Sequence, residues 1–250
     1  MKAAVINNFG ATPQYEDFAD PIPANDEILV YVKALVLENF EKGVAGGEHY
    51  SSKNMYPRFP SIVGHRGVGM TSDGKLIGFG IMRSPYGSFA EKAVVKSFVP
   101  IPDGIDAAIA AAIPPSALTS FLPLKHTAKI EKGETVLING ATGVSGRMAI
   151  QIAKLLGAGR VTGTGRNERS LKLLKSLGAD AVIDLKQSDE DLLAAFEKEK
   201  GENGYDIVID FLWGHPAEIL MKCFVPKDMR LPSNGSAIYL LALRQVRGPT

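Results

Sequence analysis

The pattern of apolar and polar positions changes near residue 126 of this chain. Before that point, short apolar runs are separated by segments rich in Pro and Gly, which is typical of short strands joined by turns. After it, compact apolar runs alternate with stretches whose apolar residues recur every three or four positions, as in amphipathic helices. The pattern predicts a β domain over residues 1–125 and an α/β domain with a doubly wound parallel sheet over residues 126–250.

The first half is predicted to contain several strands, of which that at 27–36 is the longest. The others are expected at 2–6, 75–79 and 88–95. The polar, aromatic-bearing stretch 39–60 is expected to be a loop, of a length that is more often functional than idle. Two helices are expected at 105–113 and 116–126, because the pair Pro114-Pro115 should end the first of them.

The second half is predicted to alternate strands with helices, starting from a strand at 135–138. Further strands are expected at 160–164, 181–183, 205–210 and 237–243. Helices are expected from Val144, after Asn167, from Leu192 to Lys198 and from Ala217 to Phe224. Asn167 and Ser188 are predicted to cap two of these helices, because their side chains accept hydrogen bonds from first-turn N–H groups.

The sequence GATGVSG at 140–146 places three glycines between a predicted strand and a predicted helix. Glycines let a backbone turn approach a pyrophosphate, whose charge is held by free N–H groups at the helix N-terminus. The strand–turn–helix–strand context favours dinucleotide binding over a purely structural turn. The spacing differs from the usual G-x-G-x-x-G, so it indicates a phosphate role more directly than a cofactor identity. The predicted contact residues are Gly140, Ala141, Thr142, Gly143, Val144 and Gly146.

The end of the second predicted strand bears on the choice of cofactor. An NAD site usually has an acidic residue about 20 residues after the glycines, whereas an NADP site has a cation. Here Gly165 is followed by Arg166 and, one helical step later, by Arg169. This pattern favours NADP(H), with both arginines at the 2′-phosphate. Two alternatives stay open: the arginines are ordinary solvated residues behind an Asn167 cap, or Glu168 takes the acidic role.

Composition and charge narrow the functional classes. The net charge is +1 and 45% of the residues are hydrophobic, so neither nucleic acid nor an anionic membrane surface is an expected partner. No signal peptide and no apolar run of membrane-spanning length is expected, which predicts a cytoplasmic protein. The single cysteine, Cys223, excludes an internal disulfide and a cysteine-based structural zinc site. Its apolar neighbours predict a buried structural thiol.

Several motifs, found in one order along nearly the whole chain, carry a family resemblance. They are MKAAVI at 1–6, Pro21-Ile22-Pro23, FPSIVGHRGVG at 59–69, GSFAE at 87–91, Leu118-Thr119, GATGVSG at 140–146, LGAD at 177–180 and DIVID at 206–210. With these motifs the chain resembles the medium-chain dehydrogenase/reductase superfamily, in its zinc-free quinone oxidoreductase branch. The resemblance implies a GroES-like β domain for the substrate and a Rossmann domain for the cofactor.

The resemblance also bears on metal chemistry. Zinc alcohol dehydrogenases of this superfamily have Gly-His-Glu where this chain has Gly64-His65-Arg66, and their upstream cysteine ligand has no counterpart near Asn39. We therefore expect no metal site, and we expect His65 to be packed or hydrogen-bonded. Without a Lewis acid, the implied chemistry is hydride delivery to an already electrophilic acceptor, either a quinone or an α,β-unsaturated carbonyl.

Individual roles follow from the same resemblance. Asn39 matches an asparagine beside the nicotinamide, and Thr119 matches a residue that contacts the nicotinamide side. Tyr50 resembles a substrate-cleft tyrosine, a candidate hydrogen-bond donor to the quinone oxygen. The family's usual basic residue falls near Ser170, so the arginines after the second strand would have to replace it. Alternatively, Asn39 is a turn residue and Tyr50 is one of several loop aromatics.

The length of the chain raises a competing hypothesis. Such reductases usually exceed 300 residues, so a shortened Rossmann domain is expected here, with a homodimer only if its edge is supplied. A shortened domain would suit a non-catalytic dinucleotide-binding protein, either crystallin-like, redox-sensing or degenerate. Among enzymes, an enoyl-thioester reductase is an alternative, although no basic groove for a carrier phosphate is evident. NADPH oxidation with a quinone would separate the enzyme from the non-catalytic protein.

Overall fold

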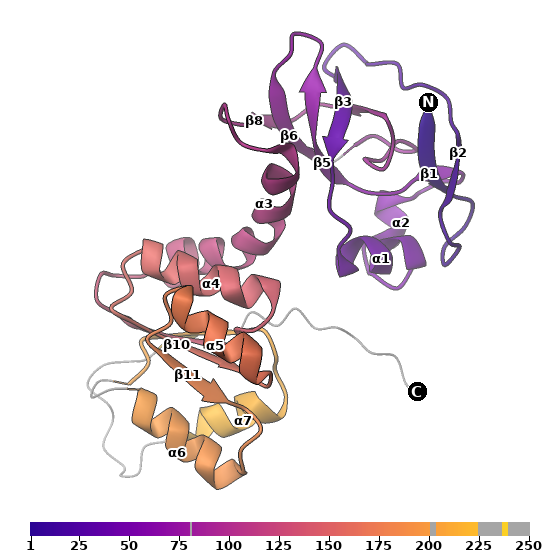
Figure 1. The fold of residues 1–250 in the computed structure, drawn as a ribbon. Helices are drawn as coiled ribbons and strands as arrows, with labels where there is room; N and C mark the ends of the chain where they lie inside the picture. The colour runs from indigo at the N-terminus through magenta and orange to yellow at the C-terminus, as the bar shows by residue number, and fades with distance from the viewer. Residues whose placement is uncertain (81, 201–203, 225–236, 240–250) are drawn as a thin grey trace. The chain divides into compact units, whose positions relative to one another are not determined.

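The computed structural model describes residues 1–80, 82–200, 204–224 and 237–239. The chain divides into two compact units, Met1–Pro114 (the N-terminal unit) and Pro115–Thr250 (the C-terminal unit) (Figure 1). The division falls inside helix α3 (Ala107–Leu122), earlier than the boundary predicted at residue 125. The chain passes from one unit to the other within a helix, so no change in loop composition marks the division.

The N-terminal unit contains two antiparallel sheets. The first has the order β2-β1-β4, with β2 (Gln14–Asp17), β1 (Lys2–Ile6) and β4 (Ser61–Ile62). The second has the order β7-β3-β5-β6-β8, with β7 (Lys92–Val95), β3 (Ile28–Ala34), β5 (Arg66–Thr71), β6 (Leu76–Gly80) and β8 (Phe98–Pro100). Three predicted strands are confirmed as β1, β3 and β6. Of the fourth, expected at 88–95, only the second half is a strand, and Ala90 makes an isolated bridge to Ala3.

The segment 39–60, expected to be a loop, contains two helices. They are α1 (Asn39–Gly46) and α2 (Ser52–Met55). The Glu41 carboxylate accepts the Glu38 backbone N–H at 3.1 Å at the start of α1, and Gly47 ends it with φ 85°. Gly43 lowers the intrinsic helix propensity of this stretch. The helix forms because Val44, fully buried, packs into an apolar cluster of this unit, and such tertiary packing outweighs propensity.

Pro114 and Pro115 do not end a helix, so the prediction of two separate helices was wrong. Helix α3 runs through both prolines to Leu122, and a π-helix, η1 (Pro123–Thr127), follows directly. Each proline removes one helical N–H. Packing on both sides of the pair compensates, because Ala111 lies in a core cluster of the N-terminal unit and Leu124 in one of the C-terminal unit.

The continuous helical segment Ala107–Thr127 also corrects a second expectation. With 21 residues and a mean hydropathy of 1.5, it is long and apolar enough to cross a membrane by length and composition. No apolar run of membrane-spanning length was expected from the sequence. One such helix is weak evidence for a membrane span, because a core helix of a water-soluble protein passes the same test; such a core helix is mostly buried, whereas 22% of this apolar window is buried.

The C-terminal unit is built on a parallel sheet with the order β11-β10-β9-β12-β13. Its strands are β9 (Thr135–Asn139), β10 (Arg160–Gly165), β11 (Ala181–Asp184), β12 (Ile207–Asp210) and β13 (Ala237–Tyr239). The helices that alternate with them are α4 (Val144–Leu155), α5 (Glu168–Ser176), α6 (Asp189–Glu199) and α7 (His215–Lys222). This is the predicted doubly wound arrangement. Residues 240–243 of the predicted fifth strand lie outside the described residues.

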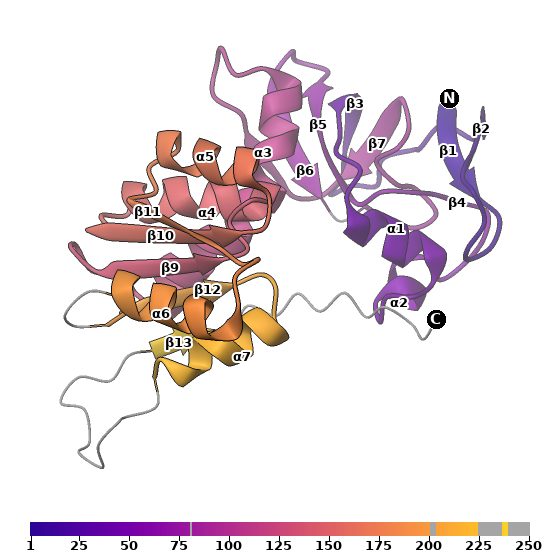
Figure 2. The same cartoon turned by 60° about the horizontal axis from the view of Figure 1, so that its bottom comes forward.

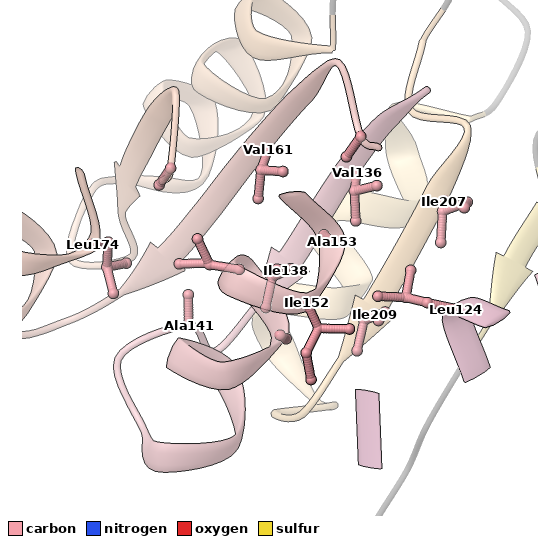
Figure 3. Close-up of a cluster of buried hydrophobic side chains, with 14 of the residues drawn as sticks. Leu124, Val136, Ile138, Ala141, Ile152, Ala153, Val161, Leu174, Ile207 and Ile209 are labelled. Atoms are coloured by element: carbon pink, nitrogen blue, oxygen red, sulfur yellow. The ribbon is translucent and has the colours of Figure 1, made fainter. Parts of the chain in front are cut away.

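The two faces of this sheet are covered by different helices (Figure 2). Val136 and Ile138 of β9 face the cluster formed with α4 and α5 (Figure 3). Leu137, between them, points the other way and packs with Phe196 of α6 and with α7. Cys223, predicted to be a buried thiol, belongs to this second cluster and is confirmed as buried. Burial on both faces explains why these strands are continuous apolar runs in the sequence.

Candidate cofactor site

The glycine turn connects the carboxyl end of β9 to the start of α4. Gly140 has φ +90°, and a Cβ there would lie 2.8 Å from the side chain of Leu212. A Cβ at Gly146 would lie 2.4 Å from the Gly140 carbonyl oxygen. A Cβ at Gly143 would meet nothing within 4 Å. The fold itself therefore requires the first and third glycines, whereas the middle glycine keeps a space open in front of the helix.

Helix α4 begins without a side-chain cap. Its N-cap is Gly143, and no side chain accepts a hydrogen bond at this helix start. Val144, the first helical residue, is 69% exposed. Free first-turn N–H groups and the positive end of the helix dipole favour an anion. The open space and the uncapped helix together fit a pyrophosphate group.

A buried chain of polar side chains supports this turn. The Thr164 hydroxyl accepts the Gly140 N–H at 3.0 Å and donates to Asn139 Oδ1 at 2.7 Å. Asn139 Nδ2 in turn donates to Asp210 Oδ1 at 3.1 Å. The three side chains are at most 2% exposed. They join the carboxyl ends of β10, β9 and β12, where ligands bind in open parallel sheets.

Asp210 also shapes the turn that follows β12. Its Oδ1 accepts the backbone N–H groups of Leu212 at 2.8 Å and Trp213 at 3.0 Å. Trp213 has φ 56°, a left-handed conformation that is uncommon for residues other than glycine. This turn places Leu212 next to Gly140. The sequence analysis did not identify these supporting residues. The one feature of the sequence that could have indicated them is a polar residue, Asn139 or Asp210, at the end of an apolar strand.

Two of the predicted contact residues meet the end of β10. A Cβ at Gly165 would lie 2.2 Å from Thr142 Cγ2, so a larger residue there would displace the turn. Ala141 is fully buried, and its N–H donates to the Thr164 carbonyl oxygen at 2.8 Å. The Ala141 N–H is therefore already used within the fold, and Ala141 holds the turn against β10. The structure thus brings the end of the second strand against the glycine turn, as a dinucleotide site requires.

Arg166 and Arg169 lie at the exposed start of α5. Asn167 caps this helix as predicted, with Oδ1 accepting the Ser170 N–H at 2.9 Å. Both arginines are exposed, and among the described residues neither forms a hydrogen bond or ion pair. Thr119, on α3, donates its hydroxyl hydrogen to the Ser116 carbonyl oxygen at 2.7 Å. The cofactor roles of all three residues stay predictions.

In the N-terminal unit, Tyr50 lies in a row of rings that begins at Phe40, the residue after Asn39. Asn39 is the exposed first residue of α1. The ring of the next residue, Phe40, lies 4.9 Å from that of His49, which lies 4.2 Å from that of Tyr50. Tyr50 is 93% exposed. Tyr50 therefore belongs to a ring cluster with Phe40 and His49, and the roles of Asn39 and Tyr50 stay predictions.

His65 is confirmed as a packed and hydrogen-bonded histidine. Its Nδ1 lies 2.9 Å from Glu41 Oε1, and its Nε2 accepts a hydrogen bond from Arg66 Nε at 2.9 Å. Burial opposes ionisation of Glu41, yet the His65 ring and backbone N–H groups keep the pKa of that carboxyl below its ordinary value. The described part of the chain contains no group of three or more His, Cys, Asp or Glu residues that could hold a metal ion.

Comparison with known proteins shows similarity to quinone oxidoreductases. A family model described as "Zinc-binding dehydrogenase" matches residues 145–223. The human quinone oxidoreductase is 27% identical over 255 residues, which cover 98% of this chain and 74% of the human protein. A crystal structure of the quinone oxidoreductase from Thermus thermophilus, also solved as its complex with NADPH, is 28% identical. It superimposes with a TM-score of 0.73 over 89% of this chain and 70% of that one.

These similarities agree with the predicted resemblance to the medium-chain dehydrogenase/reductase superfamily, in its quinone oxidoreductase-like branch. The structural similarity confirms the predicted combination of a GroES-like β unit and a Rossmann unit. Another relative, the acryloyl-coenzyme A reductase of Sulfurisphaera tokodaii, is 28% identical over 228 residues, covering 76% of this chain and 66% of that protein. A cytoplasmic location and a homodimer stay predictions.

Proposed function

We propose that this chain is an NADPH-dependent reductase that transfers a hydride, without a metal, to a quinone or an α,β-unsaturated carbonyl compound. The observation that carries the proposal is the uncapped start of α4 behind Gly143, where a Cβ would meet nothing within 4 Å. Support comes from the names of its relatives: two are quinone oxidoreductases, one of them solved with NADPH, and one is an acryloyl-coenzyme A reductase.

The C-terminal unit holds the cofactor in this proposal. The first-turn N–H groups of α4 bind the pyrophosphate, and the adenosine ribose lies at the end of β10, which Gly165 allows to pack against the glycine turn. Arg166 and Arg169 supply positive charge to the 2′-phosphate, and Thr119 contacts the nicotinamide side. These residues fit the cofactor because Gly143 leaves room for its phosphates and the end of β10 carries no acidic side chain.

The N-terminal unit serves the acceptor. Bound NADPH supplies the hydride, and the acceptor takes up that hydride and one proton. A quinone thus becomes a hydroquinone, and an α,β-unsaturated carbonyl becomes its saturated counterpart. As negative charge develops on the acceptor oxygen, the Tyr50 hydroxyl donates a hydrogen bond to it, and Asn39 keeps the role that the family resemblance implies, beside the nicotinamide. The electrophilic acceptor makes a Lewis acid unnecessary.

The test has a binding arm and a turnover arm. Calorimetric titrations with NADPH and NADH should show binding with a preference for NADPH. NADPH oxidation should then depend on an added quinone, enone or acryloyl-coenzyme A, and a metal chelator should leave the rate unchanged. If NADPH binds and no acceptor is reduced at any concentration, the reductase proposal fails and a non-catalytic dinucleotide-binding protein is the better explanation. If the chelator abolishes turnover, the metal-free chemistry is wrong.

A further inference from the structure

Arg147 is a partly buried arginine whose charge has no acidic partner among the residues that the structure describes. It lies in α4, directly after Gly146. Its Nη2 donates to the Ser170 hydroxyl at 3.3 Å, which is a long contact to a neutral acceptor. Its Nε is shielded from solvent and has no acceptor. A guanidinium that loses hydration without gaining an anion is costly, so such a site invites an anionic ligand.

The position of Ser170 indicates which anion this is. Ser170 lies in the first turn of α5, where its N–H is bonded to the cap residue Asn167. Helix α5 starts directly after the end of β10, where dinucleotide-binding folds distinguish the two forms of the adenosine ribose. Arg147 reaches this helix start from a different helix, so it approaches from the side of the glycine turn. The N-terminus of α5 adds its own preference for negative charge.

Arg147 differs from the two arginines assigned above in how firmly it is held. Arg166 and Arg169 are exposed and contact no polar group in the described part of the chain. Ordering such side chains around a ligand costs conformational entropy. Arg147 is partly buried and already rests on Ser170, so part of that cost is met by the fold. A guanidinium also binds phosphate oxygens through paired N–H groups, a geometry that a lysine cannot supply.

We infer that Arg147 is the principal cation for the 2′-phosphate of NADPH, with Arg166 and Arg169 adding exposed charge around it. A phosphate oxygen beside the Ser170 hydroxyl would accept the N–H groups that now lack a good acceptor. This inference rests on the proposed function, because it assigns the specificity of the same cofactor site. Its own content is that a residue of α4, outside the expected segment after β10, selects NADPH over NADH.

The test compares cofactor affinities of variants of the full chain. Arg147→Met keeps the aliphatic packing and removes the charge, and Arg169→Met is the matched control on the exposed helix start. Measured by calorimetry, Arg147→Met should lower the affinity for NADPH and for 2′,5′-ADP by at least about tenfold. This is the scale of one charge-assisted hydrogen bond. NADH affinity should stay within about twofold, because that molecule lacks the 2′-phosphate. Arg169→Met should lose clearly less NADPH affinity, and Arg147→Lys should recover part of the loss.

The outcomes separate this inference from the proposed function. If the unmodified chain binds NADPH and Arg147→Met binds it equally well, or if the variant loses NADPH and NADH equally, the assignment of Arg147 is overturned and the proposed function stands. If the unmodified chain binds neither cofactor, both are overturned. Should Arg147→Met fail to fold, Ser170→Glu gives an independent measurement. The new carboxylate would pair with the Arg147 guanidinium, so the affinity for NADPH should fall while that for NADH should not. Unchanged NADPH affinity would contradict the inference.

Discussion

Asp210 is a single residue on which several parts of the cofactor site depend. One of its oxygens accepts hydrogen bonds from the backbone of Leu212 and Trp213 and from the Asn139 amide. Leaving a buried donor without an acceptor costs about 1–3 kcal/mol. We therefore expect Asp210→Ala to lower the free energy of unfolding, measured by urea denaturation, by about 3 kcal/mol or more.

Two further variants make this measurement specific. Asp210→Asn keeps the accepting oxygen and should cost clearly less than the alanine variant. Asp184→Ala removes a carboxylate from the carboxyl end of β11, a strand of the same sheet that is not adjacent to β12, where it accepts the Lys186 N–H at 2.9 Å. Surface changes of this kind are usually within about 0.5 kcal/mol. Equal effects of Asp210→Ala and Asp184→Ala would show that the buried chain of side chains does not stabilise the fold.

Glu27 gives the N-terminal unit a pH-dependent contribution to stability. Arg83 donates from Nε and Nη2 to the two carboxylate oxygens at 3.0 Å, and the Ala24 N–H donates at 2.9 Å. The hydrogen bonds from Arg83 lower the pKa of Glu27 from 4.5 to about 2. Because the folded pKa lies below the unfolded one, this stabilisation is fully present above the unfolded value and is lost as the pH falls toward 2.

The corresponding variant is Glu27→Gln. It should lower the free energy of unfolding at neutral pH by about 1–2 kcal/mol, since Arg83 is partly exposed and its bonds are screened by solvent. Below the unfolded pKa the variant and the unmodified chain should converge. Urea denaturation at a series of pH values measures this convergence. Two curves that stay parallel down to acidic pH would refute a depressed Glu27 pKa.

At the scale of elements, the turn between β9 and α4 separates folding requirements from binding requirements. Gly146→Ala places a Cβ 2.4 Å from the Gly140 oxygen and should destabilise the unit, by about 1–3 kcal/mol for an overpacked site. The Cβ added by Gly143→Ala would meet no atom within 4 Å, and φ is −77° at this position, so the backbone is not strained. The unfolding temperature of this variant should therefore not change.

The methyl group added by Gly143→Ala would project into the space proposed for the pyrophosphate. We expect Gly143→Ala to weaken NADPH and NADH alike by about tenfold or more, since both carry that group. Thermal unfolding and calorimetric titration of the two glycine variants provide the comparison. Unchanged cofactor affinity in a folded Gly143→Ala protein would remove the main support for the proposed function.

The elements that could be predicted are those whose signal is local. Asn167 and Ser188 are followed at the third position by the N–H groups that they cap, so both caps were predicted correctly, although α6 begins at Asp189 and not at the predicted Leu192. Helix α1 was missed because Gly43 weakens its local signal, and its stability comes from packing of Val44. The sequence predicted two helices in place of α3 because Pro114 locally disfavours a helix. Tertiary contacts nevertheless maintain that helix.

The same distinction applies to the candidate site. The glycine turn could be recognised because a strand, a turn and a helix follow one another in the sequence. The chain of Asn139, Thr164 and Asp210 could not, because these residues are far apart in the sequence and only the register of β10, β9 and β12 brings them together. The contact between Arg147 and Ser170 likewise needs two helices whose side-chain directions the sequence does not specify.

For the whole molecule, the proposed function divides the work between the two units. Binding of the cofactor depends on residues of the C-terminal unit, whereas reduction of the acceptor also depends on the ring cluster of the N-terminal unit. Variants in the two units should therefore have different kinetic signatures. Changes at Gly143 or Arg147 should alter cofactor affinity, and changes at Tyr50 should alter the reaction of the acceptor.

Tyr50→Phe tests this division. The substitution removes only the hydroxyl, and Tyr50 is 93% exposed, so stability should not change. Loss of a donor to the developing oxyanion should lower kcat/KM for the quinone by about 100-fold, while the NADPH dissociation constant stays the same. Tyr15→Phe, at another exposed tyrosine of the same unit, is the control and should have no effect. If Tyr50→Phe reduces the quinone at the unmodified rate, the donor must be another group, and the acceptor site has to be sought away from the ring cluster.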